Sequence, residues 1–381
     1  MSRIFLKYGV NPHQSHAVVS HPREPLKVLN GQPGYINLLD ALTAWQLVIE
    51  LSASTGKAAA ASFKHVSPAG AAVERPLDEQ FLMSQFLPRR DYSPVATAYA
   101  RARGGDRMCS FGDAVAVSET VDVSLATLLK AEVSDAIIAP DYEPEALAIL
   151  SSKKGGNYLV LQMDKSYEPP SIEKREVFGF TFEQDRNSAA ITAGLFEGAP
   201  EESVETLIVA TLALKYAQSN SVCVGYDGQV IGLGAGQQSR IHCTRLACDK
   251  ADKWMLQFHP QVLALDFKEG LKKPDKANVV DQYLFWEQLS DRERADLTSQ
   301  LAKDPGPLPM AARTEWINGF DGLCLSSDAY IPFRDNIDRA ARSNVRIVAH
   351  PGGSVRDDDV RSACEQYGIT LIETGVRCFL H

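Results

Sequence analysis

A lysine and a histidine stand side by side at positions 64 and 65, in the segment Ala-Ser-Phe-Lys-His-Val-Ser-Pro-Ala-Gly. Histidine acts as a base near neutral pH, and a neighbouring ammonium group stabilises negative charge on a carbonyl oxygen. Acyl or formyl transfer to a weakly nucleophilic amine needs both functions. The pair therefore indicates such a transfer. The alternative is a strand end that carries a surface lysine and a hydrogen-bonded histidine.

Other polar segments offer groups for binding. The stretch 6–14 combines a cation, a phenol, an amide and an imidazole. In the run 216–221, Asn220 can donate a hydrogen bond to an oxyanion, and Ser219 and Ser221 can offer oxygens to a hard cation. The loop 326–336 sets aromatic rings beside carboxylates, which suits a planar heterocycle with N–H donors. The alternatives are a surface loop, a Ser or Asx turn, and a buried aromatic plug.

Bulk composition narrows the class of protein. The chain has 381 residues, 45% of them hydrophobic, which favours two soluble globular domains. We find no long apolar run and no signal peptide, so we expect a cytoplasmic protein without a membrane span. A net charge of -9 disfavours nonspecific nucleic-acid binding. The seven cysteines are scattered without a Cys-x-x-Cys pair, so we expect reduced thiols and no zinc.

Helix and strand patterns alternate from end to end, which predicts an α/β fold. Asn37 is the expected cap of a first helix, and the segment after Lys64 and His65 is expected to open another. Asp227-Gly228 between two apolar runs predicts a hairpin. Residues 163–176 are expected to connect two halves. A strand, a turn, a helix and a strand over 345–373 predict a parallel strand pair.

Several longer segments match one known family in its order and over almost the whole chain. They are Lys-Tyr-Gly-Val-Asn-Pro-His-Gln from position 7, Phe-Lys-His-Val-Ser-Pro-Ala-Gly from 63, Ala-Tyr-Ala-Arg-Ala-Arg-Gly-Gly-Asp-Arg-Met from 98, Gln-Ser-Asn-Ser-Val from 218, and Ser-Ser-Asp-Ala-Tyr-Ile-Pro-Phe-Arg-Asp-Asn from 326. Together they resemble AICAR transformylase, the transformylase portion of a bifunctional enzyme of purine biosynthesis.

The resemblance implies an activity, a fold and partners. The implied reaction moves the formyl group of 10-formyltetrahydrofolate to the 5-amino group of AICAR, and gives formyl-AICAR and tetrahydrofolate. The implied fold has two related cytidine-deaminase-like αβα halves, which we place at 1–165 and 166–381, with a helical insertion at about 262–318. The implied assembly is a homodimer with active sites at the subunit interface. No nucleic acid is expected as a partner.

The resemblance also assigns roles to individual residues. His65 matches the general base, Lys64 the group that steadies the transition state, and Asn220 the amide beside the formyl group. The positions that match AICAR contacts are Lys7, Tyr8, Gly112, Asp135, Arg240 and Arg377. Those that match the folate side are Asn30, Ile241, Tyr330, Asp335 and Ser354. The family can also hold a potassium ion, at positions that match Ser219, Ser221 and Asp328.

The sequence departs from the family at a few positions. Lys7 replaces the usual arginine and keeps the charge, but it lacks the planar fork that grips phosphate. Tyr330 replaces a more usual phenylalanine, and Leu380 stands where another histidine often appears. The transformylase motifs begin at residue 7, so a separate IMP cyclohydrolase is expected to close the ring.

Alternative functions are a non-catalytic AICAR sensor, a partner of that cyclohydrolase, and a zinc deaminase. The Lys64–His65 pair argues against a sensor, and the missing zinc-ligand motif argues against a deaminase.

Overall fold

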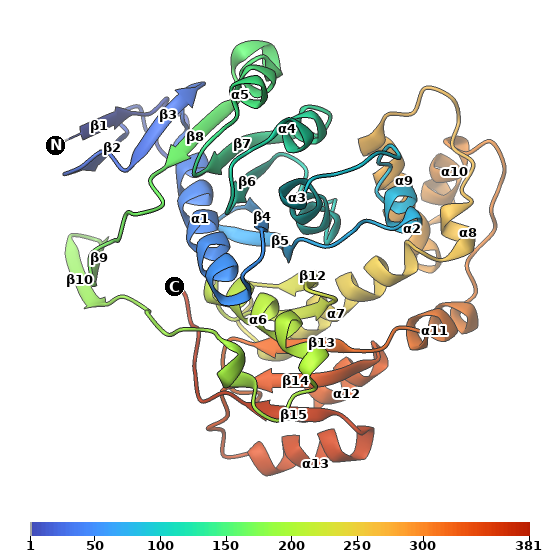
Figure 1. Ribbon diagram of the computed structural model, residues 1–381. Helices are drawn as coiled ribbons and strands as arrows, with labels where there is room; N and C mark the ends of the chain where they lie inside the picture. The colour runs from blue at the N-terminus through green and yellow to red at the C-terminus, as the bar shows by residue number, and fades with distance from the viewer. Residues whose placement is uncertain (1) are drawn as a thin grey trace.

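The computed structural model describes residues 2–381, which form one large mixed β-sheet with helices on both faces (Figure 1). The sheet has eleven strands in the order β15-β14-β13-β11-β12-β5-β4-β6-β7-β8-β3. Two small antiparallel hairpins, β1–β2 and β9–β10, stand apart from it. The expected α/β class is therefore confirmed.

The N-terminal part of the chain supplies six strands of the large sheet. Its elements are β1 (Ser2–Phe5), β2 (Val18–His21), β3 (Leu26–Asn30), α1 (Tyr35–Thr55), β4 (Ala59–Lys64), β5 (Ser67–Val73), α2 (Glu79–Ser84), α3 (Pro94–Gly104), β6 (Asp113–Val117), α4 (Val123–Lys130), β7 (Ser134–Ala139), α5 (Pro144–Ser151) and β8 (Leu159–Met163).

The C-terminal part supplies the other five strands. Its elements are β9 (Ile172–Val177), β10 (Phe180–Asp185), α6 (Glu201–Lys215), β11 (Val222–Tyr226), β12 (Gln229–Gly234), α7 (Arg240–Leu256), α8 (Pro260–Leu263), α9 (Lys273–Leu284), α10 (Asp291–Ser299), α11 (Met310–Asn318), β13 (Leu323–Ser327), α12 (Asp335–Arg342), β14 (Val345–His350), α13 (Asp357–Tyr367) and β15 (Thr370–Glu373). Helices α8 to α11 fall in the stretch predicted as a helical insertion, whereas the domain boundaries at 165 and 166 stay a prediction.

The same strand topology occurs twice. In each part a hairpin (β4–β5, then β11–β12) pairs antiparallel with a third strand (β6, then β13). Two further strands follow in parallel, first β7 and β8, then β14 and β15. The predicted parallel strand pair near the C-terminus is therefore confirmed.

Strands β5 and β12 join the two parts, antiparallel, where Ala72 faces Gln229. Because of this direction, the end of the sheet at which β4 ends and β5 begins is also the end at which β11 begins and β13 ends. We call this the turn end of the sheet. Strands β6 and β7 begin there, and β14 ends there.

Helices cover the two faces of the sheet unequally. One apolar core contains α1 and α6, and the other contains α3, α4, α5, α7, α12 and α13 (Figure 1). Helix α1 is apolar around most of its circumference, as expected for a helix packed on several sides.

Two local predictions are wrong, one for the cap of the first helix and one for the segment after Lys64 and His65. Helix α1 begins at Tyr35 with Gly34 as its cap, so Asn37 lies inside the first turn. The residues after Lys64 and His65 form strand β5, not a helix. Pro68 pairs with Phe63 next to a register shift in the β4–β5 ladder. Because the regular hydrogen bonds between the strands are interrupted there, a proline without an N–H is compatible with the strand.

One other local prediction holds. Asp227 and Gly228 have φ values of 49° and 69°, as a two-residue hairpin turn requires, and they join β11 to β12. Ser93 caps α3 by accepting a hydrogen bond from the Ala96 N–H, with Pro94 in the first turn.

The stretch 163–176, predicted as a connection, includes most of β9, which forms with β10 a hairpin that projects from the body at the left of Figure 1. Its side chains are almost all exposed, and Phe178, Phe180 and Phe182 are among the most exposed aromatic residues of the described chain.

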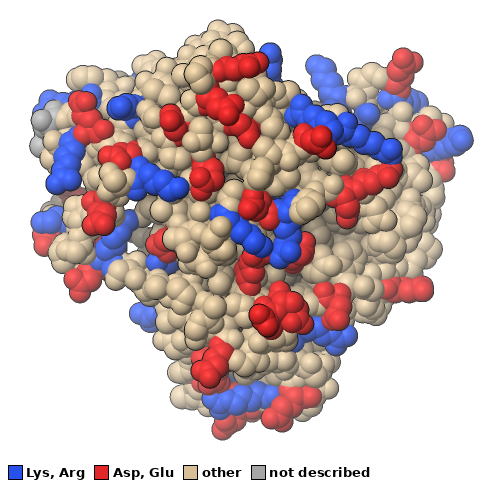
Figure 2. Space-filling view, viewed as in Figure 1, with Lys and Arg blue, Asp and Glu red and all other residues tan. Residues whose placement is uncertain are grey.

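The described surface is mixed in charge. Figure 2 shows acidic and basic side chains interspersed over the visible face, without a broad field of one sign. Among the described helices, none combines the length and the apolar composition that a membrane crossing requires.

A buried histidine at the end of β14 makes stability depend on pH. His350 is almost fully buried, its Nδ1 accepts a hydrogen bond from the Ile331 N–H (3.2 Å), and its Nε2 has no partner among the described residues. Burial lowers the pKa of His350 below its usual value of 6.5, against the opposing charges of Asp357 and Glu373. The unfolded chain therefore takes up a proton below about pH 6.5 that the folded chain does not.

We expect the free energy of unfolding to fall as the pH drops from 7 to 5. His350→Asn keeps an acceptor for the Ile331 N–H but has no titrating group, so its unfolding free energy should fall less over that interval. Urea unfolding of both proteins at pH 7 and pH 5 measures the difference. Equal losses in the two proteins would contradict this role of His350.

Candidate active site

Most residues singled out from the sequence lie at the turn end of the sheet. Lys64 ends β4 and His65 follows it, Gly112 precedes β6, and Asp135 is the second residue of β7. From the C-terminal part, residues 219–221 precede β11 and Asp328 follows β13. Topology alone therefore brings groups from widely separated positions to one end of the sheet.

His65 and Val66 form a tight turn between β4, which ends at Lys64, and β5. His65 and Val66 have φ values of 54° and 58°, in the left-handed region that a β-branched residue such as valine rarely adopts. The Val66 N–H donates to Asp40 Oδ1 at 2.6 Å. Asp40 thus ties helix α1 to the turn and holds His65 at the surface of the protein.

Asp40 is itself buried. Burial raises the pKa of the Asp40 carboxyl above its usual range, while the hydrogen bond from Val66 and the charge of His65 oppose the shift. The sequence analysis assigns Asp40 no role at the site. Nothing in the local pattern signals its contact with a turn 26 residues away.

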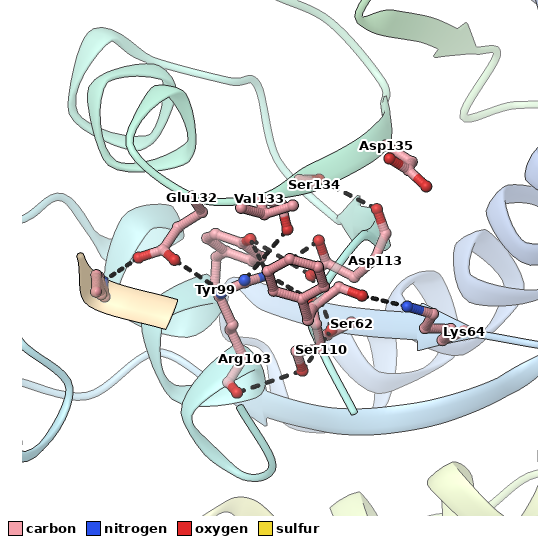
Figure 3. A network of polar contacts seen from close by, with 12 residues as sticks. Ser62, Lys64, Tyr99, Arg103, Ser110, Asp113, Glu132, Val133, Ser134 and Asp135 are labelled. Atoms are coloured by element: carbon pink, nitrogen blue, oxygen red, sulfur yellow. Dashed lines mark hydrogen bonds and ion pairs between the residues drawn. The ribbon is translucent and has the colours of Figure 1, made fainter. Parts of the chain in front are cut away.

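The ammonium group of Lys64 is held by a neighbouring loop. It donates to the carbonyl oxygen of Phe111 (Figure 3). Gly112 follows, with φ +75°, and a Cβ there would lie 3.4 Å from Lys64 Nζ and 3.6 Å from Asp135 Oδ2. Gly112 therefore lies between the lysine cation and the Asp135 carboxylate, which also forms an ion pair with Lys154.

A buried network supports this loop (Figure 3). The Arg103 guanidinium lies 3.1 Å from both the Asp113 and the Glu132 carboxylates and donates to Ser110 O at 2.7 Å. Ser62 Oγ donates to Asp113 Oδ2 at 2.8 Å. Burial raises the pKa of Asp113, and Arg103 opposes it. Arg103 lies in the family segment that begins at position 98, which is the signal for this network in the sequence.

A second cluster centres on Arg240, the first residue of α7. Its guanidinium donates to Asn220 Oδ1 (2.9 Å) and to Ser221 O (2.8 Å), and it forms an ion pair with Asp328. Asp328 Oδ2 also accepts from Ser219 Oγ (2.7 Å) and from Ser221 N (2.9 Å). Arg240 and Asp328 are both almost fully buried.

The C-terminal tail closes over this cluster. The Cys378 N–H donates to Asp328 O at 2.8 Å, and Leu380 N donates to Ser219 Oγ at 3.0 Å. Arg377 is exposed, and its guanidinium lies 4.8 Å from the Phe379 ring centroid. The tail thus places Arg377 beside the residues that hold Asn220.

The two clusters meet within one chain. The Gln218 N–H donates to Ser67 Oγ at 3.3 Å, and this bond joins the loop before β11 to the β4–β5 turn. His65 lies two residues before Ser67, and Asn220 lies two residues after Gln218. The base, the cation and the amide expected from the sequence are therefore close in the fold.

The residues expected on the folate side are not all brought together. Ile241 follows Arg240 at the start of α7, and Tyr330, Asp335 and Ser354 lie after β13 and β14. Asn30 ends β3, eight strand positions from β13, or about 38 Å along a sheet of usual spacing. Its side chain donates to Gly156 O and Tyr158 O (3.1 and 2.7 Å).

Lys7 and Tyr8 belong to the N-terminal segment and are exposed. The backbone N–H of Lys7 donates to Pro33 O at 3.4 Å, which places the segment beside the loop after β3. A cavity of about 430 Å³ is lined by Phe333, Arg334, Asp335, Arg356, Asp359 and Ser362, and so includes Asp335. Another, of about 170 Å³, includes none of the residues expected from the sequence.

The buried Arg240–Asp328 pair is expected to stabilise this part of the fold. Asp328→Asn removes the counter-charge of Arg240, and breaking a buried pair in this way typically costs about 3–5 kcal/mol. Urea unfolding should show a loss of that size. Asp296→Asn, at an exposed position of α10, is the matched control and should change stability by less than about 0.5 kcal/mol. Equal stability of the two variants would show that the pair does not stabilise the fold.

Comparison with known proteins identifies the family. The family model described as "AICARFT/IMPCHase bienzyme" matches residues 2–250. The bifunctional purine biosynthesis protein PurH of Magnetococcus marinus is 29% identical over 390 aligned positions, and that of Aquifex aeolicus 28% over 387. Each alignment covers 99% of this chain, which spans 59% of either relative. The chain belongs to the AICARFT/IMPCHase bienzyme family.

Proposed function

We propose that the chain transfers the formyl group of 10-formyltetrahydrofolate to the 5-amino group of AICAR, a step of purine biosynthesis. The observation that carries this proposal is the position of Lys64 and His65, one hydrogen bond away from the loop of Asn220. Membership of the family supports the choice of substrates. The relatives are named as purine biosynthesis proteins.

The three residues address separate difficulties of the reaction. His65 takes a proton from the amine of AICAR as its nitrogen bonds to the formyl carbon. Lys64 and Asn220 stabilise the negative charge that develops on the formyl oxygen. The bond from the formyl carbon to N10 of the folate then breaks, N10 takes a proton, and tetrahydrofolate leaves. The amide oxygen of Asn220 accepts a hydrogen bond from Arg240, so the amide NH₂ group of Asn220 can donate to the formyl oxygen.

Rate effects typical of other enzymes indicate how much each group contributes to catalysis. General-base assistance typically contributes about 10²–10⁴-fold. Loss of one donor to an oxyanion typically costs about 10²–10³-fold. Both effects require a fixed geometry, which the Asp40–Val66 hydrogen bond supplies for the base.

AICAR would lie between Asp135 and the C-terminal tail. Its contacts in this proposal are Lys7, Tyr8, Gly112, Asp135, Arg240 and Arg377. Lys7 and Arg377 are exposed cations suited to the phosphate group. Arg240 Nε is buried and has no hydrogen-bond partner among the described residues.

The folate site would be shared between two chains. Asn30 ends β3, whereas Asp335 begins helix α12 after β13, so a single chain does not gather the folate residues at one place. A homodimer with active sites at the interface brings Asn30 of one chain toward Ile241, Tyr330, Asp335 and Ser354 of the other. The repeated strand topology is what two related deaminase-like halves require.

Ser219, Ser221 and Asp328 would hold a potassium ion. Ser221 Oγ is buried and has no hydrogen-bond partner in residues 2–381, and Asp328 supplies carboxylate oxygens to the same cluster. Because Arg240 already balances the charge of Asp328, a monovalent ion fits better than a divalent one. Such an ion would fix the loop of Asn220 to the C-terminal tail.

Replacement of the base gives the direct test of the proposed function. We expect His65→Ala to lower turnover of AICAR and 10-formyltetrahydrofolate by about 10²–10⁴-fold, because the amine loses its base. AICAR affinity should change little, since His65 is not among the proposed binding residues. Release of tetrahydrofolate measures turnover, and calorimetry measures affinity.

The exposed His16 supplies the control, because His16→Ala removes a histidine outside the proposed site. Its turnover should equal that of the unmodified chain. Near-normal turnover of folded His65→Ala would refute the assignment of the base. AICAR binding by the unmodified chain without any turnover would favour the sensor, or a partner of a separate IMP cyclohydrolase.

A further inference from the structure

The guanidinium group of Arg103, on helix α3, joins two backbone segments that lead to residues of the proposed site (Figure 3). Its Nη1 donates a hydrogen bond to Ser110 O at 2.7 Å, in the loop before β6. Its Nη2 donates to Val133 O at 3.2 Å, directly before β7. One side chain therefore links two segments that are far apart in the sequence.

Each of these segments continues into a residue of the proposed site. Phe111, the next residue of the first segment, supplies the carbonyl oxygen that accepts a hydrogen bond from Lys64. Asp135 lies two residues after Val133, in β7. The Gly112 N–H also donates to Val133 O at 2.9 Å, so the two segments contact each other directly. The orientation of the Arg103 side chain therefore affects the positions of Lys64 and Asp135 together.

Two buried carboxylates fix the guanidinium group. Arg103 forms ion pairs with Asp113 and Glu132, each at 3.1 Å, and the three residues are 7%, 0% and 8% exposed. A buried charge needs such partners, and they leave the guanidinium in one orientation. A lysine would keep the charge, but it lacks the planar fork whose N–H groups reach two carbonyl oxygens and two carboxylates at once.

A hydroxyl group ties the strand of Lys64 to the same network. Ser62 lies two residues before Lys64 in β4 and is fully buried. Its Oγ lies 2.8 Å from both Asp113 Oδ2 and Ser110 Oγ. Lys64 is thus held at its backbone through Ser62 and at its ammonium group through the carbonyl oxygen of Phe111.

We propose that Arg103 is a positioning residue for the formyl transfer, which sets Lys64 for the transition state and Asp135 for AICAR. The proposal rests on the proposed function, because it takes the roles of Lys64 and Asp135 from it. Arg103 is buried and acts through its neighbours rather than on a substrate. A displacement of about 1 Å that originates far from the chemistry can cost about 10²-fold in rate. The alternative is that Arg103 only stabilises the fold.

Arg103→Lys tests the proposal, because it keeps the charge and removes the fork that joins the two segments. We expect kcat to fall about 10–100-fold, since Lys64 is displaced. The Kd of AICAR should rise about tenfold, since Asp135 is displaced. Release of tetrahydrofolate measures kcat, calorimetry measures the Kd, and both are expressed per folded molecule. Unchanged kcat and Kd would overturn the proposal.

Double-mutant cycles provide the readout that a purely structural role would not change. If Arg103 acts through Lys64, Arg103→Lys should lower kcat less than about twofold in a chain that already carries Lys64→Ala. In the same way, it should change the Kd of AICAR less than about twofold once Asp135→Asn is present. Effects that simply multiply in both cycles would show that Arg103 acts independently of the two residues, and would overturn the proposal.

Arg101→Lys is the matched control. Arg101 lies on the same helix and is buried to a similar degree, but it binds at the opposite end of the sheet, where it donates to Val73 O at 3.4 Å and pairs with Asp227 at 3.3 Å. Its replacement should lower the free energy of unfolding and leave kcat within about twofold of the unmodified chain. An equal loss of kcat in the two lysine variants would contradict a specific role of Arg103.

Ser62→Ala replaces Arg103→Lys if the latter does not fold. It removes only the hydroxyl group that ties β4 to the network, so kcat should fall about 3–10-fold, the usual weight of one hydrogen bond. This loss should again disappear when Lys64→Ala is present. An unchanged kcat of Ser62→Ala would then overturn the proposal.

Failure of the proposed function gives a different pattern. If the unmodified chain binds AICAR but releases no tetrahydrofolate, the formyl transfer is wrong. The calorimetric cycle of Arg103 with Asp135 then still decides whether Arg103 positions a residue that binds AICAR. If the unmodified chain turns over and neither cycle shows coupling, only the role of Arg103 is wrong.

Discussion

The antiparallel pairing of β5 with β12 is the constraint on which the rest of the structure depends. The two parts of the sheet share one topology, and a parallel joint would place equivalent strand ends at the same end of the sheet. The end of β4, next to His65, and the start of β11, next to Asn220, would then lie at opposite ends of the sheet. The antiparallel joint brings them together instead, and the Gln218–Ser67 hydrogen bond closes the contact.

Two buried carboxylates fix the groups that this joint brings together. Asp40 holds the left-handed turn of His65, and Asp328 holds Arg240, which in turn holds the amide of Asn220. Each carboxylate acts through a partner that is distant in sequence. Because the partners are fixed before any substrate arrives, a reaction at this place would meet groups already in position. The potential chemistry of the site thus rests on long-range packing.

Local features of the fold were predictable where one physical rule dominates. Asp227-Gly228 favours a two-residue hairpin turn almost regardless of context, and the prediction is confirmed. The segment after His65 is predicted as a helix start but forms a strand, because the turn takes φ values that valine rarely adopts and that the hydrogen bond to Asp40 stabilises. The candidate site residues at the turn end of the sheet were named from the family resemblance. The family segment from position 98 marks Arg103 but not its partners, and nothing in the local sequence marks the support by Asp40, because both depend on contacts between distant segments.

A crystal structure of the chain with bound AICAR tests the central claim most directly. The account predicts that the 5-amino nitrogen of AICAR lies within hydrogen-bond reach of a His65 ring nitrogen, about 2.6–3.2 Å, with Lys64 on the same side. It also predicts that the phosphate group lies toward Arg377. A nucleotide bound elsewhere, with His65 and Lys64 facing only solvent, would contradict the account.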